Sequence, residues 1–300
     1  MAVAALPPAG PPVIGRASRG ERVKDLAFRG ALLAATGVAM AVLAALVIDV
    51  ARDGAPVLSW DFITSFPSQV IPASSGVQSA LVGTLLLMLV VAVFIVPVGT
   101  ATAVYLEEYA DGTRWWNRLI EVNIQNLASV PSIVYGILGL AFIVRGPLGL
   151  GRVLLAGALT LGLLVLPVVI IVARESIRAV PSSIREGSLA LGATGWQTIW
   201  KQVLPAALPG IATGVILALS RAIGETAPLL VVGAAAFARF NPNGLGDLFT
   251  AMPILIFNWV QDVDDEFRTL AAGAILVLLA LLLAMNAVAI YLRNRYEQKW

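Results

Sequence analysis

Six long apolar stretches, separated by more polar segments, run through this chain of 300 residues. They cover positions 30–50, 77–106, 122–144, 153–173, 205–237 and 269–292. About 20 apolar residues are enough for a helix to cross a bilayer. A further apolar stretch at 250–260 is too short to cross and predicts a re-entrant or interfacial helix. The pattern therefore predicts an all-α integral membrane protein with six transmembrane helices.

Composition agrees with this prediction and removes several classes of protein. Hydrophobic residues make up 59% of the chain and charged residues 13%, whereas a typical soluble domain has about 45–50% and about 25%. The chain contains neither cysteine nor histidine. This excludes a disulfide scaffold, a thiol nucleophile and a Ser-His-Asp triad. We expect no catalytic residue and no metal site, and a cytosolic enzyme is excluded.

The distribution of lysine and arginine predicts the orientation. Most of them lie on the side that would hold both termini, in segments 1–29, 107–121, 174–204 and 293–300. The positive-inside rule then places both termini and the 174–204 segment in the cytoplasm. Residues 1–29, which are basic and contain four prolines at positions 7, 8, 11 and 12, are expected to be a cytoplasmic N-terminal tail.

The polar segment 174–204 has the pattern of two short helices. Ser182 and Ser183 followed by Glu186 are typical of a helix start with a hydroxyl cap, and small residues near Gly192 allow a tight turn. A second helix would then place apolar side chains on one face, namely Trp196, Ile199, Trp200 and Val203. This predicts a helix at the membrane surface that is offered to a cytoplasmic partner. The alternative is an ordinary amphipathic interfacial helix.

The same segment resembles the EAA loop of ABC importer permeases. That loop reads Glu-Ala-Ala, three residues, Gly, nine residues, Ile, one residue and Leu-Pro. The matching positions here are Glu186, Gly187, Ser188, Gly192, Leu204 and Pro205. Two positions depart from the pattern, because Gly187 and Ser188 replace the alanines and Gln202 replaces the isoleucine. The resemblance implies that this coupling loop docks in a groove of a separate ATPase subunit.

Three other segments are similar to permeases of the phosphate-specific importer. They are VYLEEYA at 104–110, NLASVPSIVYGILG at 126–139 and ALSRAIGETAPLLV at 218–231. The ETAPLL run resembles the PstA-type subunit more than its PstC-type partner. The resemblance implies the MetI-like permease fold of type I ABC importers, with residues 30–300 as the transmembrane permease domain.

The resemblance also implies an assembly in a bacterial inner (plasma) membrane. Its other members would be a PstC-like second permease, two PstB-like ATP-binding subunits and an extracytoplasmic PstS-like phosphate-binding protein. The phosphate-cradling pattern G-x-x-x-x-G-K-[ST] is absent from this sequence. We therefore expect that this chain is not an enzyme, holds no cofactor and binds no nucleic acid, and that ATP and Mg are bound by the ATPase partner. Besides these proteins, it would contact membrane lipid.

A charged pair lies well inside the fifth apolar stretch. Arg221 and Glu225 are four residues apart and would share one helix face. A charge inside a membrane is costly, so it usually faces protein or water, and an arginine fork suits a phosphate oxyanion. We expect these two residues to line the substrate pathway, with Ser220 and Thr226 adding hydroxyl donors. The alternative is a structural ion pair, and Pro228 is expected to bend the helix just beyond it.

Polar residues also follow one line of the third apolar stretch. Asn126, Ser129, Ser132 and Tyr135 recur at three-residue steps. Lining the pathway is one possible role, and hydrogen bonding between helices is the favoured one. At the end of the second stretch, Glu107 and Glu108 are expected to be solvated or paired with arginines of the following turn, at positions 114 and 118.

Together these features predict the permease subunit of an ATP-driven importer of inorganic phosphate. The nearest alternative is an ABC permease for another oxyanion, such as sulfate or molybdate. An ion-coupled secondary transporter is a more distant one, because it would need no ATPase-docking loop.

Overall fold

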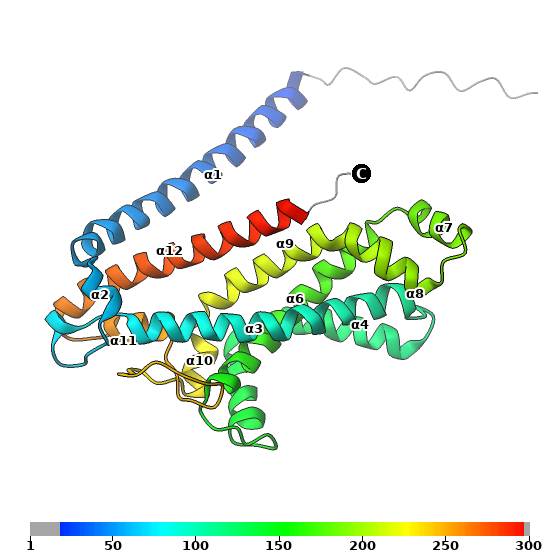
Figure 1. Ribbon diagram of the computed structural model, residues 1–300. Helices are drawn as coiled ribbons and strands as arrows, with labels where there is room; N and C mark the ends of the chain where they lie inside the picture. Colours follow the sequence, from blue (N-terminus) through cyan, green and yellow to red (C-terminus); the bar gives the residue numbers. More distant parts are fainter. Residues whose placement is uncertain (1–18, 297–300) are drawn as a thin grey trace, which may run out of the picture. The chain divides into compact units, whose positions relative to one another are not determined.

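The computed structural model describes residues 19–296, and in that part of the chain all regular elements are helical (Figure 1). The long helices are α1 (Arg19–Gly54), α3 (Gln78–Val104), α4 (Trp115–Ala128), α6 (Leu154–Arg178), α9 (Leu204–Ile223) and α12 (Asp265–Tyr296). The short ones are α2 (Trp60–Thr64), α5 (Ser132–Leu138), α7 (Ser182–Ala190), α8 (Gly195–Thr198), α10 (Ala227–Val232) and α11 (Met252–Val260).

Five shorter helical segments adjoin these helices or lie between them. Two are 3-10 helices, η1 (Ala55–Val57) and η2 (Pro72–Ser74). Three are π-helical turns, η3 (Tyr105–Tyr109), η4 (Gly139–Val144) and η5 (Ile199–Val203). In η3 the amide of Ala110 reaches back five residues to the carbonyl of Tyr105, at 2.8 Å. Such turns are rare and occur often at functional sites.

The helices confirm a multi-pass membrane protein. Within the described residues, five helices are long and apolar enough to cross a membrane, or six if the bent pair α4 and α5–η4 counts as one span. The third span consists of two helical halves, α4 and α5–η4, which meet at 110° instead of forming one straight helix. The predicted spans are therefore confirmed in number under that reading, and the third differs in shape.

The chain divides into two compact units, Met1–Asp49 and Val50–Trp300. In the first unit the described residues form the larger part of α1, which begins at Arg19, within the segment predicted to be a tail. The four prolines of that tail, at positions 7, 8, 11 and 12, lie outside the described residues.

In the second unit, α6 packs against both α3 and α9 (Figure 1). The middle of the bundle is an apolar cluster that includes Leu87, Leu161 and Ala222. One end, which we call the α11 end, is a cluster around Trp259, which lies between Phe62 and Phe267. The opposite end, the α7 end, is a cluster of α3, α6 and α9 residues.

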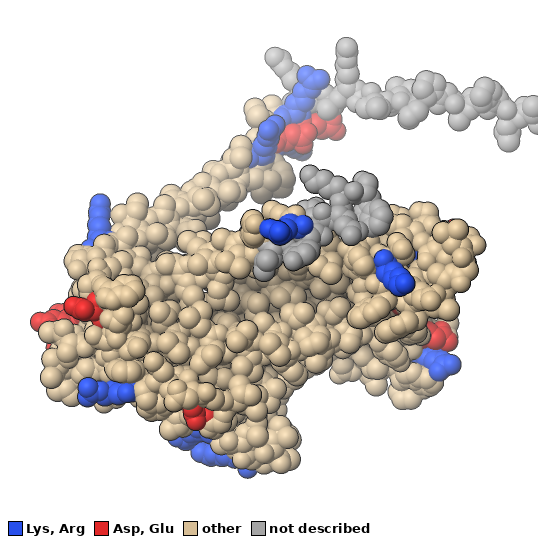
Figure 2. All heavy atoms as spheres, viewed as in Figure 1, with Lys and Arg blue, Asp and Glu red and all other residues tan. Residues whose placement is uncertain are grey.

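Small residues let these helices approach one another closely. A side chain at Gly83 of α3 would collide with the backbone carbonyl of Thr250, and one at Gly157 of α6 would enter the ring of Phe249. Glycine at helix crossings is typical of membrane proteins, because helix association there depends on close van der Waals packing. On the face of the second unit drawn in Figure 2, charged side chains are few.

The short apolar stretch near 250–260 forms α11, as its length predicts. Its first amide, that of Met252, donates to the hydroxyl of Thr84 on α3 at 2.9 Å, in a buried position. Five of its nine residues, including Trp259, are buried, and α11 packs against α3 and α12. α11 is therefore a packed part of the α11 end of the bundle.

Candidate functional site

The fifth predicted span is broken at the charged pair. α9 ends at Ile223, and α10 begins at Ala227 after a non-helical link, Gly224–Thr226. Nε of Arg221 lies 3.3 Å from Oε1 of Glu225, so the predicted ion pair forms across the end of α9. The Arg221 side chain is 44% exposed and that of Glu225 is 18% exposed. The guanidinium group is thus accessible, while its carboxylate partner is held against the protein.

Pro228 does not bend a helix beyond the charged pair, as was expected. It occupies the second residue of α10, where its fixed backbone angle is compatible with a helix start and its missing amide is not needed. The break lies before it, at Gly224–Thr226, and not beyond the site. The fifth span is therefore interrupted between Ile223, where α9 ends, and Ala227, where α10 begins, and is not bent at Pro228 as predicted.

The two hydroxyl residues predicted beside the pair differ in their surroundings. Oγ of Ser220 lies 2.7 Å from the carbonyl oxygen of Ile216 and 2.7 Å from Oδ1 of Asn286 on α12. Its single proton is thus shared between two acceptors within the fold. Thr226 is half-buried and precedes α10 without capping it by its side chain.

The polar residues of the third span shape the bend between α4 and α5. Oγ of Ser129 donates to the carbonyl of Asn126 at 2.7 Å, and the hydroxyl of Tyr135 donates to the carbonyl of Leu127 at 2.9 Å. Pro131 comes two residues after Ser129 and directly precedes α5. These bonds satisfy carbonyls that lose helical partners where α4 ends. They join the two halves of one bent span, and not two separate spans as expected.

The two broken spans meet each other. α5 packs against α10, and Gly136 lies so close to Pro228 that a Cβ at this glycine would be 2.8 Å from the proline Cα. Tyr135 belongs to the same apolar cluster as Ala222 and Ile223 at the end of α9. The bends of both spans are therefore held against one another in the middle of the second unit.

The EAA-like residues lie on a helical hairpin at the α7 end. Glu186 and Gly187 are exposed on α7, and Ser188 bonds the hydroxyl of Thr198 on α8 at 2.9 Å. Gly192 forms the turn with φ of +84°, a conformation that favours glycine. Leu204 is buried in the cluster at this end, and Pro205 follows it at the start of α9. Exposed Leu189 and Leu191 complete an apolar outer surface.

The helix start predicted at Ser182–Ser183 is correct, but its cap is not. α7 begins at Ser182 after Pro181, and no side chain caps it. The capping box is at the next helix, where the hydroxyl of Thr194 accepts from the amide of Gln197, and the side chain of Gln197 accepts from the amide of Thr194. This cap begins the continuous helical run Gly195–Ile223.

Replacing Thr194 with alanine should therefore loosen the hairpin without disrupting the bundle. Removing a threonine cap costs about 1 kcal/mol. We expect faster hydrogen exchange in 195–203, measured by mass spectrometry, and little change in α6. Thr113→Ala, at an exposed turn far from α8 in sequence, is the control, and equal protection of 195–203 in both variants would contradict the role of the cap.

Two aromatic residues of this run lie at the surface. The indoles of Trp196 and Trp200 stack with centroids 5.4 Å apart, and both side chains are more than half exposed. They line an open apolar groove of about 1040 Å³ between α3 and α9. Ile199 and Val203, predicted on the same apolar face, are instead buried in the cluster at the α7 end.

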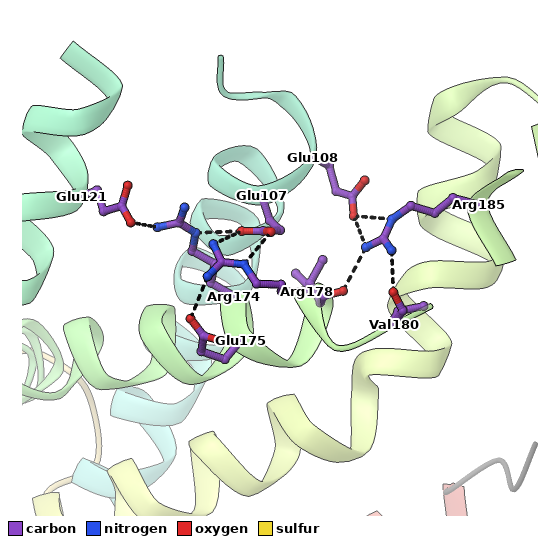
Figure 3. A network of polar contacts seen from close by, with 9 residues as sticks. Glu107, Glu108, Glu121, Arg174, Glu175, Arg178, Val180 and Arg185 are labelled. Atoms are coloured by element: carbon purple, nitrogen blue, oxygen red, sulfur yellow. Dashed lines mark hydrogen bonds and ion pairs between the residues drawn. The ribbon is translucent and has the colours of Figure 1, made fainter. Parts of the chain in front are cut away.

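A network of arginines and glutamates holds the α7 end together (Figure 3). Glu107 in η3 accepts from Nε of Arg174 at 2.8 Å and from Nε of Arg178 at 2.9 Å, both on the last turns of α6. Arg174 also reaches Glu121 of α4, with 2.6 Å between Nη1 and Oε1. The carboxylate of Glu107 is 16% exposed. Three helices therefore meet at one half-buried cluster of opposite charges.

The neighbouring Glu108 contacts a different element. Its Oε1 accepts from Nη2 of Arg185 at 2.8 Å and from Nε of the same residue at 3.2 Å. The prediction that Glu107 and Glu108 are solvated or paired with residues 114 and 118 is wrong, since their partners are Arg174, Arg178 and Arg185. The sequence offered one signal for these contacts. Two adjacent glutamates end the second span, and three arginines follow the fourth span on the same predicted side of the membrane, at positions 174, 178 and 185.

The sequence matches the model of a known family over residues 95–299. That family is described as the binding-protein-dependent transport system inner membrane component. The chain belongs to this family. Such permeases are not themselves enzymes, and the MetI-like permease fold predicted from the EAA-like loop is confirmed for this one.

Two relatives and one solved structure show where this permease lies within the family. It is 37% identical over 220 residues to the phosphate transport system permease protein PstA 1 of Mycobacterium tuberculosis, covering 73% of this chain and 71% of the relative. It is 31% identical over 266 residues to the probable phosphate transport system permease protein PstA of Methanocaldococcus jannaschii, covering 88% and 91%. These similarities confirm a PstA-type permease.

The solved structure is an inward-facing form of the MetNI methionine ABC transporter. A chain of that transporter superposes with a TM-score of 0.61 at 19% identity, covering 74% of this permease and 96% of that chain. At this identity the likeness concerns the fold alone. Importers of this class work with ATPase and substrate-binding proteins, so the helical hairpin at the α7 end belongs to a chain that functions in an assembly.

Proposed function

We propose that this chain is the permease subunit of an ATP-driven importer of inorganic phosphate. The accessible guanidinium group of Arg221 carries the proposal, because it lies where the fifth span is broken inside the membrane segment. The phosphate-named relatives support the same substrate.

The chemistry of the pair suits an anion in transit. Phosphate leaving water loses hydrogen bonds, which costs free energy unless donors replace them. Arg221 offers a planar fork of N–H donors that matches phosphate geometry, and Glu225 at 3.3 Å neutralises it when no anion is present. Ser220 and Thr226 would add hydroxyl donors, with Ser220 also required to exchange its bond to Asn286. Because the pair is long and its guanidinium group is accessible, it is easily opened.

The proposed mechanism is alternating access driven from the α7 end. Two ATPase subunits would bind ATP and Mg, close on one another and move the docked hairpin 182–200. Exposed Glu186, Leu189 and Leu191 supply a polar and apolar surface for docking. This movement would reorient the broken spans around Arg221. The positive-inside rule supports a cytoplasmic location for this end and for both termini.

The bent third span supports a second, PstC-like permease as partner. α4, and α5 with η4, are each about 20 Å long, less than the roughly 30 Å of a bilayer core, and meet at 110°. Exposed Gln125, Asn126 and Ser129 lie at this bend. Irregular backbone at membrane depth is tolerated only against protein or water. A second permease facing this surface would supply that cover, and a PstS-like protein would deliver phosphate from outside.

The direct test is uptake of radiolabelled phosphate at micromolar concentration. Cells that lack this chain and other high-affinity phosphate systems are compared before and after re-expression of the wild type, with sulfate and molybdate as competitors. We expect restored uptake that unlabelled phosphate abolishes and the other oxyanions leave intact. If sulfate or molybdate blocks the restored uptake, the substrate is another oxyanion. If re-expression restores no uptake, phosphate is not the substrate.

A further inference from the structure

The acidic pair in η3 has no part in the pathway proposed for Arg221. Glu107 and Glu108 are adjacent in sequence, yet Glu107 binds α6 and Glu108 binds α7. The π-helical turn between Tyr105 and Tyr109 carries both of them at the end of α3. A single turn of α3 is thus bonded to the last turns of one helix and to the separate hairpin that follows it.

Arg185 is the point where three elements meet. It lies on α7, bonds Glu108 of η3 through Nε and Nη2, and donates to two carbonyls at the end of α6. These are the carbonyl of Ile177, 2.9 Å from Nη2, and the carbonyl of Val180, 2.6 Å from Nη1. Carbonyls at a helix C-terminus lack helical partners and favour a cation. The guanidinium fork therefore satisfies α6 and η3 simultaneously (Figure 3).

The rest of α7 is held lightly. None of its residues is buried. Besides Arg185, its attachments are half-buried Ile184, which packs on the cluster at the α7 end, and the hydroxyl bond between Ser188 and Thr198. The Arg185 and Glu108 side chains, in contrast, are 24% and 12% exposed. Charge-assisted bonds in such partly buried positions are stronger than exposed ion pairs.

We propose that the pair Arg185–Glu108 transmits movement of the α7 hairpin to α3. Arg185 acts as a positioning residue, next to Glu186 of the docking surface, and does not itself contact substrate. The Glu107 cluster fixes α3 to α4 and α6, so a displacement that enters through Arg185 moves these helices as one body. This inference rests on the proposed function and adds the residues through which ATP hydrolysis in partner subunits drives transport.

The test uses the complete complex, purified and reconstituted with its ATPase and binding-protein subunits in proteoliposomes. Phosphate transport and ATP hydrolysis are measured together for wild type, Arg185→Glu, Glu108→Arg and the double exchange. We expect each single reversal to lower phosphate transported per ATP by about tenfold or more, as the loss of charged hydrogen bonds predicts. Hydrolysis should persist, and the double exchange should restore part of the ratio.

Arg268→Glu provides the matched control. Arg268 pairs with Asp265 at 2.9 Å in an exposed position at the start of α12, at the α11 end. The same charge reversal there should leave the ratio of transport to hydrolysis unchanged. If this control lowers the ratio as strongly as Arg185→Glu, the effect is one of net charge and the proposal is overturned.

A second measurement does not depend on transport. Hydrogen exchange is compared with and without ATP in wild type and in Arg185→Glu. ATP should alter exchange in 182–190 in both proteins, and should alter it in 105–109 in the wild type alone. Equal propagation in both proteins would overturn the link, as would a double exchange that assembles without restoring the ratio. A wild-type complex that carries no phosphate would contradict the proposed function, while the exchange data would still decide the link.

Discussion

Arg221→Gln is expected to reduce phosphate uptake by about 10- to 100-fold while the transporter still assembles. The variant keeps a similar length and a hydrogen-bonding end but removes the charge. A hydrogen bond to a charged group contributes about 1.5–3 kcal/mol, which corresponds to this range of rates or affinities. Initial rates of radiolabelled uptake over a series of phosphate concentrations measure the effect, and a blot of the purified complex measures assembly.

Two further variants define what the result means. Arg145→Gln, the same change at an exposed arginine outside the helices, should leave uptake near the wild-type rate. Arg221→Lys keeps the charge without the fork and should recover part of the activity, because lysine binds phosphate as a point charge. If assembled Arg221→Gln transports normally, the pair with Glu225 is structural, which is the alternative considered for these residues.

Gly83→Ala should destabilise the bundle strongly, although it adds one methyl group. The new Cβ would lie against the backbone carbonyl of Thr250, which cannot rotate away as a side chain can. Overpacking of this kind costs about 1–3 kcal/mol. We expect lower yield and a Tm in detergent that is lower by several degrees, measured by differential scanning fluorimetry.

Gly246→Ala is the control for that measurement. No heavy atom lies within 4 Å of the position that its Cβ would take, and its φ is not in the left-handed region. Its Tm should remain at the wild-type value. A Gly83→Ala protein as stable as this control would mean that α3 and the segment before α11 separate without cost.

The membrane-spanning architecture was predictable because hydrophobicity acts locally. A run such as 153–173 forms a transmembrane helix whatever packs around it, because a helix satisfies the hydrogen bonds of its own backbone in lipid. The short helix α11 followed from length by the same reasoning. The bends did not follow, because hydropathy does not register where a helix stops. Gly224 and Pro131 lie within apolar runs, and their effect depends on packing between α5 and α10.

The candidate site was predictable only where its residues lie close together in sequence or follow a known motif. The ion pair of Arg221 and Glu225 follows from a spacing of four residues, and it forms in the structure, although the helix ends between them. The EAA-like loop followed from resemblance. The partners of Glu107 and Glu108 lie more than 60 residues away in sequence, so no local pattern identifies them. The helix cap was placed on the wrong hairpin arm, because two serines and Thr194 offer equivalent side-chain chemistry.

The stacked indoles of Trp196 and Trp200 give the α7 end an optical signal of its own. Two rings 5.4 Å apart and inclined at 23° couple their near-ultraviolet transitions, so their circular dichroism depends on the angle between them. Both are exposed to solvent in the isolated chain, and a docked subunit would replace that solvent. Assembly of the transporter is therefore expected to be visible in unlabelled protein, as a blue shift in tryptophan emission with an altered near-ultraviolet spectrum.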